Sequence, residues 1–395
     1  MAARFLLHEV SDLCLAKPAL RSLSVTNTVA DALSALKRLD ESYLSVWSCH
    51  HSSLKAESSP QEGGKAEDCR CIGRVCMLDI ICFLCKPENL SSPATALQSP
   101  ISVLIPNNLE LVRHLEPNAS FLEAIDHMLE GVQNLVIRIE NRISARKKLS
   151  SLDSTLHNNN LGYCWVTQED VIRNLLNSIG LFSPIAGNPI NSLGVIDTNN
   201  LLAVYYDDPA SSALDLIAES LVDQSSVAIV DTEGKLIGEI SPFTLNSCDE
   251  GVSAAIATLS AGDLMAYIDC GGPPDELVQL VKERLEEQNL GAAVELLGEE
   301  SSGLTSWSSF SSSTSSDEEF NSMKSGKHVG YSARLVRRAE AIVCYPWSSL
   351  VAVIVQAIAH RVSYVWVVEE DGTLTGVVTF AGILKVFREH LNSLS

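Results

Sequence analysis

The stretches VAIVDTEGKLIGEIS (227–241) and VWVVEEDGTLTGVVT (365–379) decide the fold, because they nearly superimpose. Both place two glycines, an acidic turn and a final hydroxyl residue at the same offsets; Gly238 and Gly376 are the second glycines. Apolar runs on either side of a glycine-containing turn are typical of two antiparallel strands in a hairpin. Two copies of one hairpin indicate an internal repeat.

A helix is predicted before each hairpin, over 212–221 and 349–359, where apolar residues recur at helical spacing behind a serine that can cap the helix. The same order of helix and hairpin occurs twice more, once with a capping-box pattern at Ser120. These two copies comprise the helices 28–39 and 120–129 and the strand regions 44–48, 72–79, 135–139 and 164–170.

Four repeats therefore organise the chain. We expect repeat 1 at 1–90 with a loop insertion at 50–70, repeat 2 at 91–185 with a loop insertion at 140–160, repeat 3 at 186–250, and repeat 4 at 251–395 with a Ser-rich acidic insertion at about 298–330. Both loop insertions fall between the strands of a hairpin, where long loops cost little entropy. In the acidic tract, Ser315 and Ser316 precede three carboxylates, which is typical of acid-directed phosphorylation.

Composition narrows the class of protein. The chain has 395 residues, is 46% hydrophobic and carries a formal net charge of -21, so its field repels phosphate backbones and anionic lipid surfaces. We expect no nucleic-acid partner and no membrane association. The most apolar stretch, 347–359, is shorter than the roughly 20 residues of a spanning helix. The first residues lack a secretory signal, so we expect an intracellular, cytoplasmic protein.

The 11 cysteines are expected to be reduced thiols, mostly in the core. Cys82 and Cys85 form a Cys-x-x-Cys surrounded by apolar residues, which favours a buried helix face over a redox pair. One group has soft-metal ligand types, but it lacks the paired spacing of a zinc finger and favours a loop without metal: Cys49, His50, His51, Cys69 and Cys71. A metal-binding protein stays open as a minor alternative.

No catalytic constellation is present: the sequence has no nucleophile elbow, Walker loop, His-Glu-x-x-His or dinucleotide glycine fingerprint. We expect a protein that is not an enzyme and has no resident cofactor.

The four repeats resemble those of the CBS (cystathionine-beta-synthase) domain proteins, whose domains end in a Gly-x-apolar-Ser/Thr-x-x-Asp signature. The layout is similar to plant CBS-domain-containing proteins of the CBSX type and to the gamma regulatory subunits of AMP-activated and SNF1-related kinases. The resemblance implies an α+β fold in which four CBS repeats form two tandem Bateman modules in a pseudo-symmetric disk. It also implies adenosine-nucleotide sites, with the signature hydroxyl on phosphate and the carboxylate on ribose.

The signature is degenerate in each repeat. Repeat 1 keeps Gly73 and Asp79 but has Cys76 at the hydroxyl position, whereas repeat 2 keeps both Thr167 and Asp170 with Cys164 in place of the glycine. Repeats 3 and 4 keep the glycine and the hydroxyl but lose the carboxylate: Gly238, Ser241 and Thr244 in repeat 3, and Gly376, Thr379 and Gly382 in repeat 4. The Thr167–Asp170 pair is thus the best candidate nucleotide site.

His360 and Arg361 resemble the His-Arg step that gamma-type subunits use against nucleotide phosphates, and a guanidinium suits that contact. Helix capping is the alternative reading of Thr167 with Asp170, and of Asp79, Ser241 and Thr379. A solvated helix end is the alternative for His360 and Arg361.

The favoured function is regulatory: binding of AMP, ADP or ATP and modulation of a partner such as a kinase complex or a redox enzyme, with a homodimer as a further candidate assembly. The competing function is a ligand-free interaction scaffold whose degenerate clefts are filled by side chains such as Trp165 and Pro242.

Overall fold

The computed structural model of the protein describes residues 8–39, 42–49, 69–106, 111–139, 162–269, 273–297 and 340–394. Within these ranges lie four sheets of three strands each. In every sheet a short first strand runs parallel to the second, and the third runs antiparallel to the second. The common strand order confirms an α+β protein of four repeats.

Repeats 1 and 2 each have the order strand, helix, strand, strand, helix. Repeat 1 consists of β1 (Ser22–Ser24), α2 (Val29–Leu39), β2 (Leu44–Cys49), β3 (Cys69–Val75) and α3 (Met77–Leu84). Repeat 2 consists of β4 (Val112–Leu115), α6 (Phe121–Leu129), β5 (Asn134–Ile139), β6 (Gly162–Thr167) and α7 (Gln168–Asn177). Short elements precede and connect them: η1 (Val10–Cys14), α4 (Pro87–Leu90), α5 (Pro93–Leu97) and η3 (Ile101–Leu104).

Repeats 3 and 4 follow the same order. Repeat 3 consists of β7 (Ala203–Tyr205), η6 (Ala210–Ala213), α9 (Leu214–Asp223), β8 (Val227–Val230), β9 (Leu236–Ile240) and α10 (Pro242–Leu245). Repeat 4 consists of β10 (Val343–Cys344), α14 (Leu350–His360), β11 (Tyr364–Val368), β12 (Leu374–Thr379) and α15 (Phe380–Leu394). The remaining elements are η4 (Ile179–Phe182), α8 (Ser183–Ala186), η5 (Ile190–Ser192), α11 (Val252–Thr258), α12 (Ala261–Tyr267), α13 (Asp275–Glu287) and η7 (Gly291–Leu297).

Serine caps fix two of the predicted helix starts. Ser120 accepts a hydrogen bond from the Glu123 amide at 3.1 Å, and Ser349 accepts one from the Ala352 amide at 3.4 Å. The predicted cap at Ser212 is wrong, because this hydroxyl donates to the Pro209 carbonyl within the 3-10 turn η6. Helix α9 therefore begins two residues later, at Leu214.

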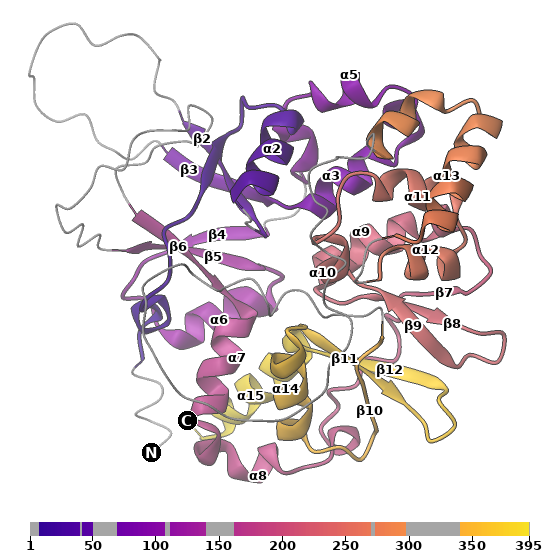
Figure 1. The fold of residues 1–395 in the computed structure, drawn as a ribbon. Helices are drawn as coiled ribbons and strands as arrows, with labels where there is room; N and C mark the ends of the chain where they lie inside the picture. Colours follow the sequence, from indigo (N-terminus) through magenta and orange to yellow (C-terminus); the bar gives the residue numbers. More distant parts are fainter. Residues whose placement is uncertain are drawn as a thin grey trace, which may run out of the picture.

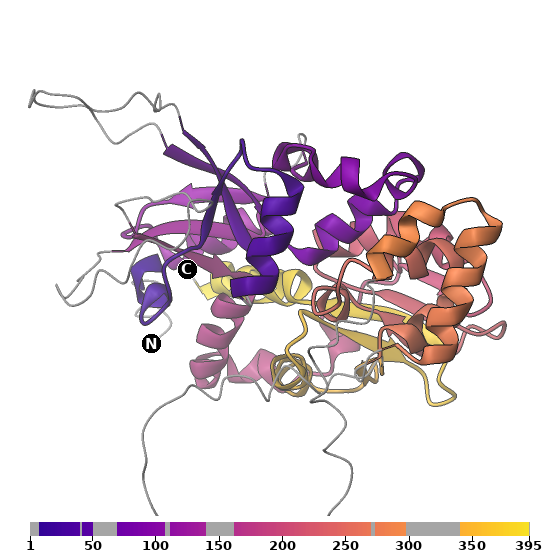
Figure 2. The ribbon, with the colours of Figure 1, turned by 45° about the horizontal axis from the view of Figure 1, so that its top comes forward.

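The four repeats occupy four quadrants of a disk (Figures 1 and 2), as predicted. Within each tandem module the sheets face one another: β3 contacts β4, and the β8–β9 turn pairs with the β11–β12 turn through a bridge between Lys235 and Thr373. Between modules the helices pack. One core cluster joins repeats 1 and 3, and a second joins repeats 2 and 4.

The helices α11, α12 and α13, over 252–287, pack on the core shared by repeats 1 and 3, α13 through Val281 and Leu285. The sequence division places these residues in repeat 4, so the chain that links the last two repeats packs with repeat 3. The repeat boundaries themselves stay a prediction. Of the loop insertions, 50–68 and 140–161 lie outside the described residues, as does the acidic tract with Ser315 and Ser316.

A chain segment crosses the third strand of a neighbouring repeat at the signature position. Residues before β7 cross β12, where Asp197 bridges Val377, and a Cβ on Gly376 would lie 2.4 Å from the Ile196 side chain. Ile105, before β4, crosses β3 in the same way, 3.0 Å from a Cβ on Gly73. Glycine is needed there because another segment occupies the space of the side chain.

Repeat 2 departs from this pattern. Its ladder runs without a register shift, whereas the other three third strands are irregular at the residue directly before the signature glycine: Ile72, Ile237 and Thr375. Cys164 pairs with Ile137 at that position, and η1, which precedes β1, packs on β6. In repeat 2, Cys164 therefore takes the place of the glycine at the point where the N-terminal segment crosses β6.

His114 lies between the sheets of repeats 1 and 2. Its ring stands edge-on to Trp47 and Tyr163, with centroids 5.6 and 5.9 Å apart, and its Nε2 accepts a hydrogen bond from the Cys71 amide at 3.0 Å. An accepting Nε2 carries no proton. Burial, followed by the charge of Arg70, holds the pKa of His114 below its ordinary value.

The lowered pKa of His114 predicts acid sensitivity. The folded state favours the neutral ring, so its contribution to stability is present above about pH 6.5 and is lost as the pH falls through the lowered folded pKa. We expect the melting temperature to fall more steeply between about pH 6.5 and 5 in the wild type than in His114→Gln, which keeps an acceptor but does not titrate. Parallel curves for the two proteins would contradict this.

Candidate functional site

A cavity of about 100 Å³ lies where repeats 1, 3 and 4 meet. Its lining includes two arginines, Arg74 and Arg361, and no carboxylate among the described residues. The remaining lining is largely hydroxyl-bearing or apolar: Tyr43, Ser220, Leu221, Gln224, Ser225, Ser241, Pro242, Phe243, Val362, Ser363 and Tyr364. In a chain of net charge -21, two guanidiniums beside several hydroxyls form a site suited to an anion.

Arg74 is held in place by contacts from two repeats. It extends from β3 and stacks over the Tyr43 ring at 4.4 Å, and its guanidinium donates to Gln133 Oε1. Gln133, directly before β5, in turn donates to the backbone carbonyls of Leu221 and Val222 in α9. This buried amide ties repeats 1, 2 and 3 together and orients the arginine beside the cavity.

Arg361 contributes the second guanidinium. It is the C-terminal cap of α14 in the left-handed conformation, with φ 57°, which turns the chain from the helix into β11. Its side chain is exposed and has no hydrogen-bond or ion-pair partner in the part of the chain that the structure describes. It is therefore available to an incoming anion.

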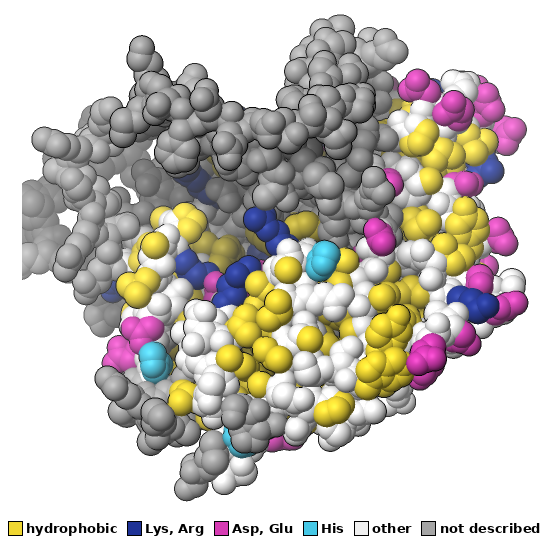
Figure 3. Space-filling model, turned by 60° about the horizontal axis from the view of Figure 1, so that its bottom comes forward, with side chains coloured by type: hydrophobic (Ala, Val, Ile, Leu, Met, Phe, Trp, Pro, Cys, Tyr) yellow, Lys and Arg dark blue, Asp and Glu magenta, His cyan; other side chains and the backbone are white. Residues whose placement is uncertain are grey.

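Ser241 supplies a hydroxyl directly beside the start of α10. Its Oγ accepts a hydrogen bond from the Phe243 amide at 3.2 Å and lies within hydrogen-bonding distance, 3.0 Å, of the Tyr364 hydroxyl. The signature hydroxyl of repeat 3 and the arginine of repeat 4 thus line one cavity, although 120 positions separate them. Figure 3 shows the uneven charge on one face of the protein: most Lys and Arg side chains lie on one half, and most Asp and Glu side chains lie along the opposite edge.

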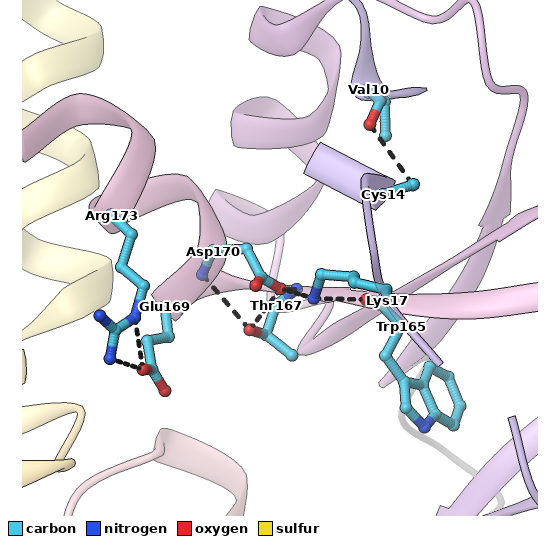
Figure 4. A network of polar contacts seen from close by, with 8 residues as sticks. All are labelled: Val10, Cys14, Lys17, Trp165, Thr167, Glu169, Asp170 and Arg173. Carbon is cyan, nitrogen blue, oxygen red and sulfur yellow. Dashed lines mark hydrogen bonds and ion pairs between the residues drawn. The ribbon is translucent and has the colours of Figure 1, made fainter. Parts of the chain in front are cut away.

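The Thr167–Asp170 pair lies elsewhere and is already engaged (Figure 4). The two residues form a capping box at the start of α7, in which Asp170 Oδ2 accepts from the Thr167 amide at 2.7 Å and from its hydroxyl at 2.9 Å. The same oxygen forms an ion pair with Lys17 Nζ at 2.5 Å, and Lys17 also donates to the Trp165 carbonyl at 2.8 Å. A lysine from the N-terminal segment therefore covers the carboxylate predicted to bind ribose.

The other predicted residues serve as helix caps or lie at the surface. Asp79 accepts from the Cys76 amide at 2.7 Å in the capping box of α3, and burial raises the pKa of this carboxyl. Thr379 accepts from the Gly382 amide at 3.2 Å. His360 is exposed at the end of α14 and does not line the cavity.

Among the described residues, no group of three or more His, Cys, Asp or Glu side chains could hold a metal ion; His50 and His51 lie outside these ranges. Burial raises the pKa of Cys71 and of Cys82 to about 12 each. No helix in the described ranges is long and apolar enough to span a bilayer.

The comparisons with known proteins agree with the four-repeat fold. The CBS domain family matches residues 340–389. The chain is 45% identical over its full length to the CBS domain-containing protein CBSX5 of Arabidopsis thaliana, of which it covers 100%. It belongs to the family of CBS domain-containing proteins.

More distant relatives match nearly the whole length of the chain. The SNF1-related protein kinase regulatory subunit gamma-like PV42b of Arabidopsis thaliana is 22% identical over 99% of this chain and 97% of its own. Protein MJ1225 of Methanocaldococcus jannaschii, a candidate archaeal homologue of g-AMPK, superposes with a TM-score of 0.52 at 15% identity over 96% of this chain and 100% of its own. These likenesses extend over all four CBS repeats.

Sequence reasoning missed several residues of both sites. Arg74, Tyr43 and Ser363 line the cavity without belonging to the signature. Lys17 pairs with Asp170 across 153 positions, and no local pattern indicates that contact. The position of Arg74 directly after the signature glycine Gly73 is the one signal that could have drawn attention to it.

Proposed function

We propose that this CBS-domain protein is a regulatory subunit that binds the phosphate group of an adenosine nucleotide, AMP, ADP or ATP, in the cavity lined by Arg74 and Arg361. The observation that carries the proposal is the exposed guanidinium of Arg361, which has no hydrogen-bond or ion-pair partner among the described residues, beside Arg74 and Ser241. Charge-assisted hydrogen bonds from Arg to phosphate are about twice as strong as neutral ones. The residues that line the cavity are suited to binding an anion, and we propose no catalytic activity for them.

The cavity size favours recognition of the phosphate end. Its volume of about 100 Å³ is below the roughly 300 Å³ of a pocket that encloses a whole small ligand. The nucleoside would therefore extend from the cavity past the exposed Phe243 and Arg361. Because three repeats supply the lining, a bound phosphate would favour one arrangement of the two modules over others, which is the basis of a regulatory response.

The partner we propose is a protein kinase complex of the SNF1-related type. A full-length relative carries the name of a gamma-like regulatory subunit of that kinase. The partner is tested by adding the purified chain to the kinase catalytic subunit, with and without AMP, and measuring phosphorylation of a peptide substrate. A chain that neither binds nor alters the kinase would contradict this part of the proposal.

Thermal shift with a ligand panel tests the nucleotide site. We expect AMP, ADP or ATP to raise the melting temperature of the wild type and adenosine to leave it unchanged, because the phosphate supplies the contacts. A ligand at about 100 times its Kd adds roughly 2.7 kcal/mol to the free energy of unfolding. Arg361→Ala should lose the shift, and the adjacent His360→Ala, which is exposed and outside the cavity, should keep it.

A ligand-free scaffold is the second candidate, and the Lys17–Asp170 ion pair favours it. That contact fills the repeat 2 position at which the family signature is most complete. If the protein is a ligand-free scaffold, no nucleotide will change its melting temperature. An equal shift in wild type and Arg361→Ala would instead place the ligand outside the Arg74–Arg361 cavity.

A further inference from the structure

Cys14 and Cys164 form a thiol pair between the N-terminal segment and repeat 2. Cys14 ends η1, and Cys164 lies in β6 at the position where the other repeats have the signature glycine. The turn η1 packs on β6, and both cysteines pack in the core shared by repeats 2 and 4, where each thiol alters the pKa of the other. The Cys14 thiol also donates to the Val10 carbonyl at 3.5 Å. Cys14 is half-buried, whereas Cys164 is fully buried, so one thiol of the pair can meet a reagent from solvent.

The pKa of Cys14 is shifted in the opposite direction from those of Cys71 and Cys82. The hydrogen bond from Cys164 holds the pKa of Cys14 below its ordinary value, and Lys17 lowers it further, against the opposing effects of burial and Asp170. The pKa of Cys164 is raised, first by that contact with Cys14 and then by burial. Burial also raises the pKa of Cys344 to about 12. A half-buried thiol with a lowered pKa next to a fully buried thiol is the arrangement of an attacking and a resolving cysteine.

Polar contacts hold the crossing segment, residues 10–20, against repeat 2 on both sides of the thiol pair. The Val10 amide donates to the Ala119 carbonyl at 3.0 Å, and the Leu20 amide donates to the Tyr163 carbonyl at 2.8 Å. Between them, Lys17 reaches Asp170 and the Trp165 carbonyl (Figure 4). A covalent bond from Cys14 to Cys164 would fix this segment one residue from the carbonyl that Lys17 contacts.

We propose that Cys14 and Cys164 form a reversible disulfide that locks the crossing segment, and with it Lys17, over the Thr167–Asp170 capping box of repeat 2. The oxidant is a small-molecule disulfide of the glutathione class. The Cys14 thiolate attacks one sulfur of glutathione disulfide, that S–S bond breaks, and one glutathione thiolate leaves.

The second step closes the protein disulfide. Cys164 attacks the Cys14 sulfur of the mixed disulfide and gives its proton to the second glutathione sulfur, which leaves as a thiol. Two protein thiols are oxidised and one glutathione disulfide is reduced to two thiols, so atoms and electrons balance. The inference is independent of the proposed nucleotide site, because neither cysteine lines that cavity.

Peptide mapping of the full-length chain in glutathione buffers of increasing oxidation tests the disulfide. Trypsin releases residues 5–21, with Cys14 as their one cysteine, and residues 149–173, with Cys164 as theirs. We expect a cross-linked pair of these peptides in the oxidised sample, lost on adding dithiothreitol. Hydrogen exchange of the amides in 8–20 should slow at least about tenfold in the oxidised protein, since each tenfold corresponds to about 1.4 kcal/mol of local stability.

Serine variants provide the controls. Cys14→Ser and Cys164→Ser should each abolish the cross-link, and Cys344→Ser, at a buried thiol of repeat 4, should leave it unchanged. The wild-type map does not depend on any variant folding. Glutathionylation of Cys14 without a cross-link, or pairing of Cys14 with a different cysteine, would overturn the proposal.

Discussion

Glu239→Ala is expected to lower the free energy of unfolding by about 3 to 5 kcal/mol. Glu239, in β9, is 1% exposed and accepts hydrogen bonds from the Tyr364 hydroxyl at 2.9 Å and from the Trp366 indole N–H at 2.8 Å. Both donors belong to β11 of repeat 4 and are themselves buried. Alanine leaves two buried donors without this acceptor and opens a cavity between the sheets of repeats 3 and 4.

Glu239→Gln is the matched control for the lost acceptor. The amide keeps one oxygen and the side-chain volume but turns an NH2 group toward one of the two donors. We expect roughly half the loss of the alanine variant, measured by chemical denaturation with fluorescence of the tryptophans. Equal losses in the two variants would mean that packing, and not hydrogen bonding, accounts for the contribution of Glu239.

Gly376→Ala is expected to destabilise the protein by roughly 3 kcal/mol. Its Cβ would lie 2.4 Å from the Ile196 side chain and 3.0 Å from the Asp197 carbonyl oxygen. The backbone at Asp197 exchanges two hydrogen bonds of 2.9 Å with Val377, so the crossing segment cannot move away without breaking them. The strain therefore falls on the contact between repeats 3 and 4.

Alanine variants at two other glycines serve as controls, because the space for a Cβ differs among the three positions. At Gly73 a Cβ would approach only the Ile105 side chain, at 3.0 Å, which can yield, so Gly73→Ala should cost less. At Gly180 the space within 4 Å is empty, and Gly180→Ala should have little effect. Melting temperatures ranked Gly180→Ala, Gly73→Ala, Gly376→Ala from highest to lowest are expected; a different order would mean that the crossing segments adapt more easily than their hydrogen bonds indicate.

The repeats could be predicted because short stretches of sequence carry the signals for their hairpins and helix caps. The hairpins at 227–241 and 365–379 combine period-two apolar residues with a glycine that has positive φ in each turn, 79° at Gly234 and 86° at Gly372. Caps at Ser120 and Ser349 are equally local signals. The helix at 212 was placed too early, since Pro209 begins a 3-10 turn that competes with a serine cap.

The site could be predicted only in part, because its residues converge from distant segments. Ser241 and Arg361 were singled out by the family signature and by the His-Arg step, and they line one cavity. The sequence ranked Thr167 and Asp170 higher, since both polar positions are retained there. No local pattern in the sequence predicts the path of the N-terminal segment, which brings Lys17 to Asp170. The cavity is instead lined by residues of repeats 1, 3 and 4, whose signatures are more degenerate.

Calorimetric titration of AMP into the wild type, Arg361→Ala and Asp170→Asn tests the central claim most directly. The account predicts saturable binding to the wild type, a loss of about tenfold or more in affinity for Arg361→Ala, which corresponds to the roughly 1.5 to 3 kcal/mol of a hydrogen bond to a charged group, and nearly unchanged affinity for Asp170→Asn. Binding that is lost in Asp170→Asn and retained in Arg361→Ala would contradict it and return the site to repeat 2.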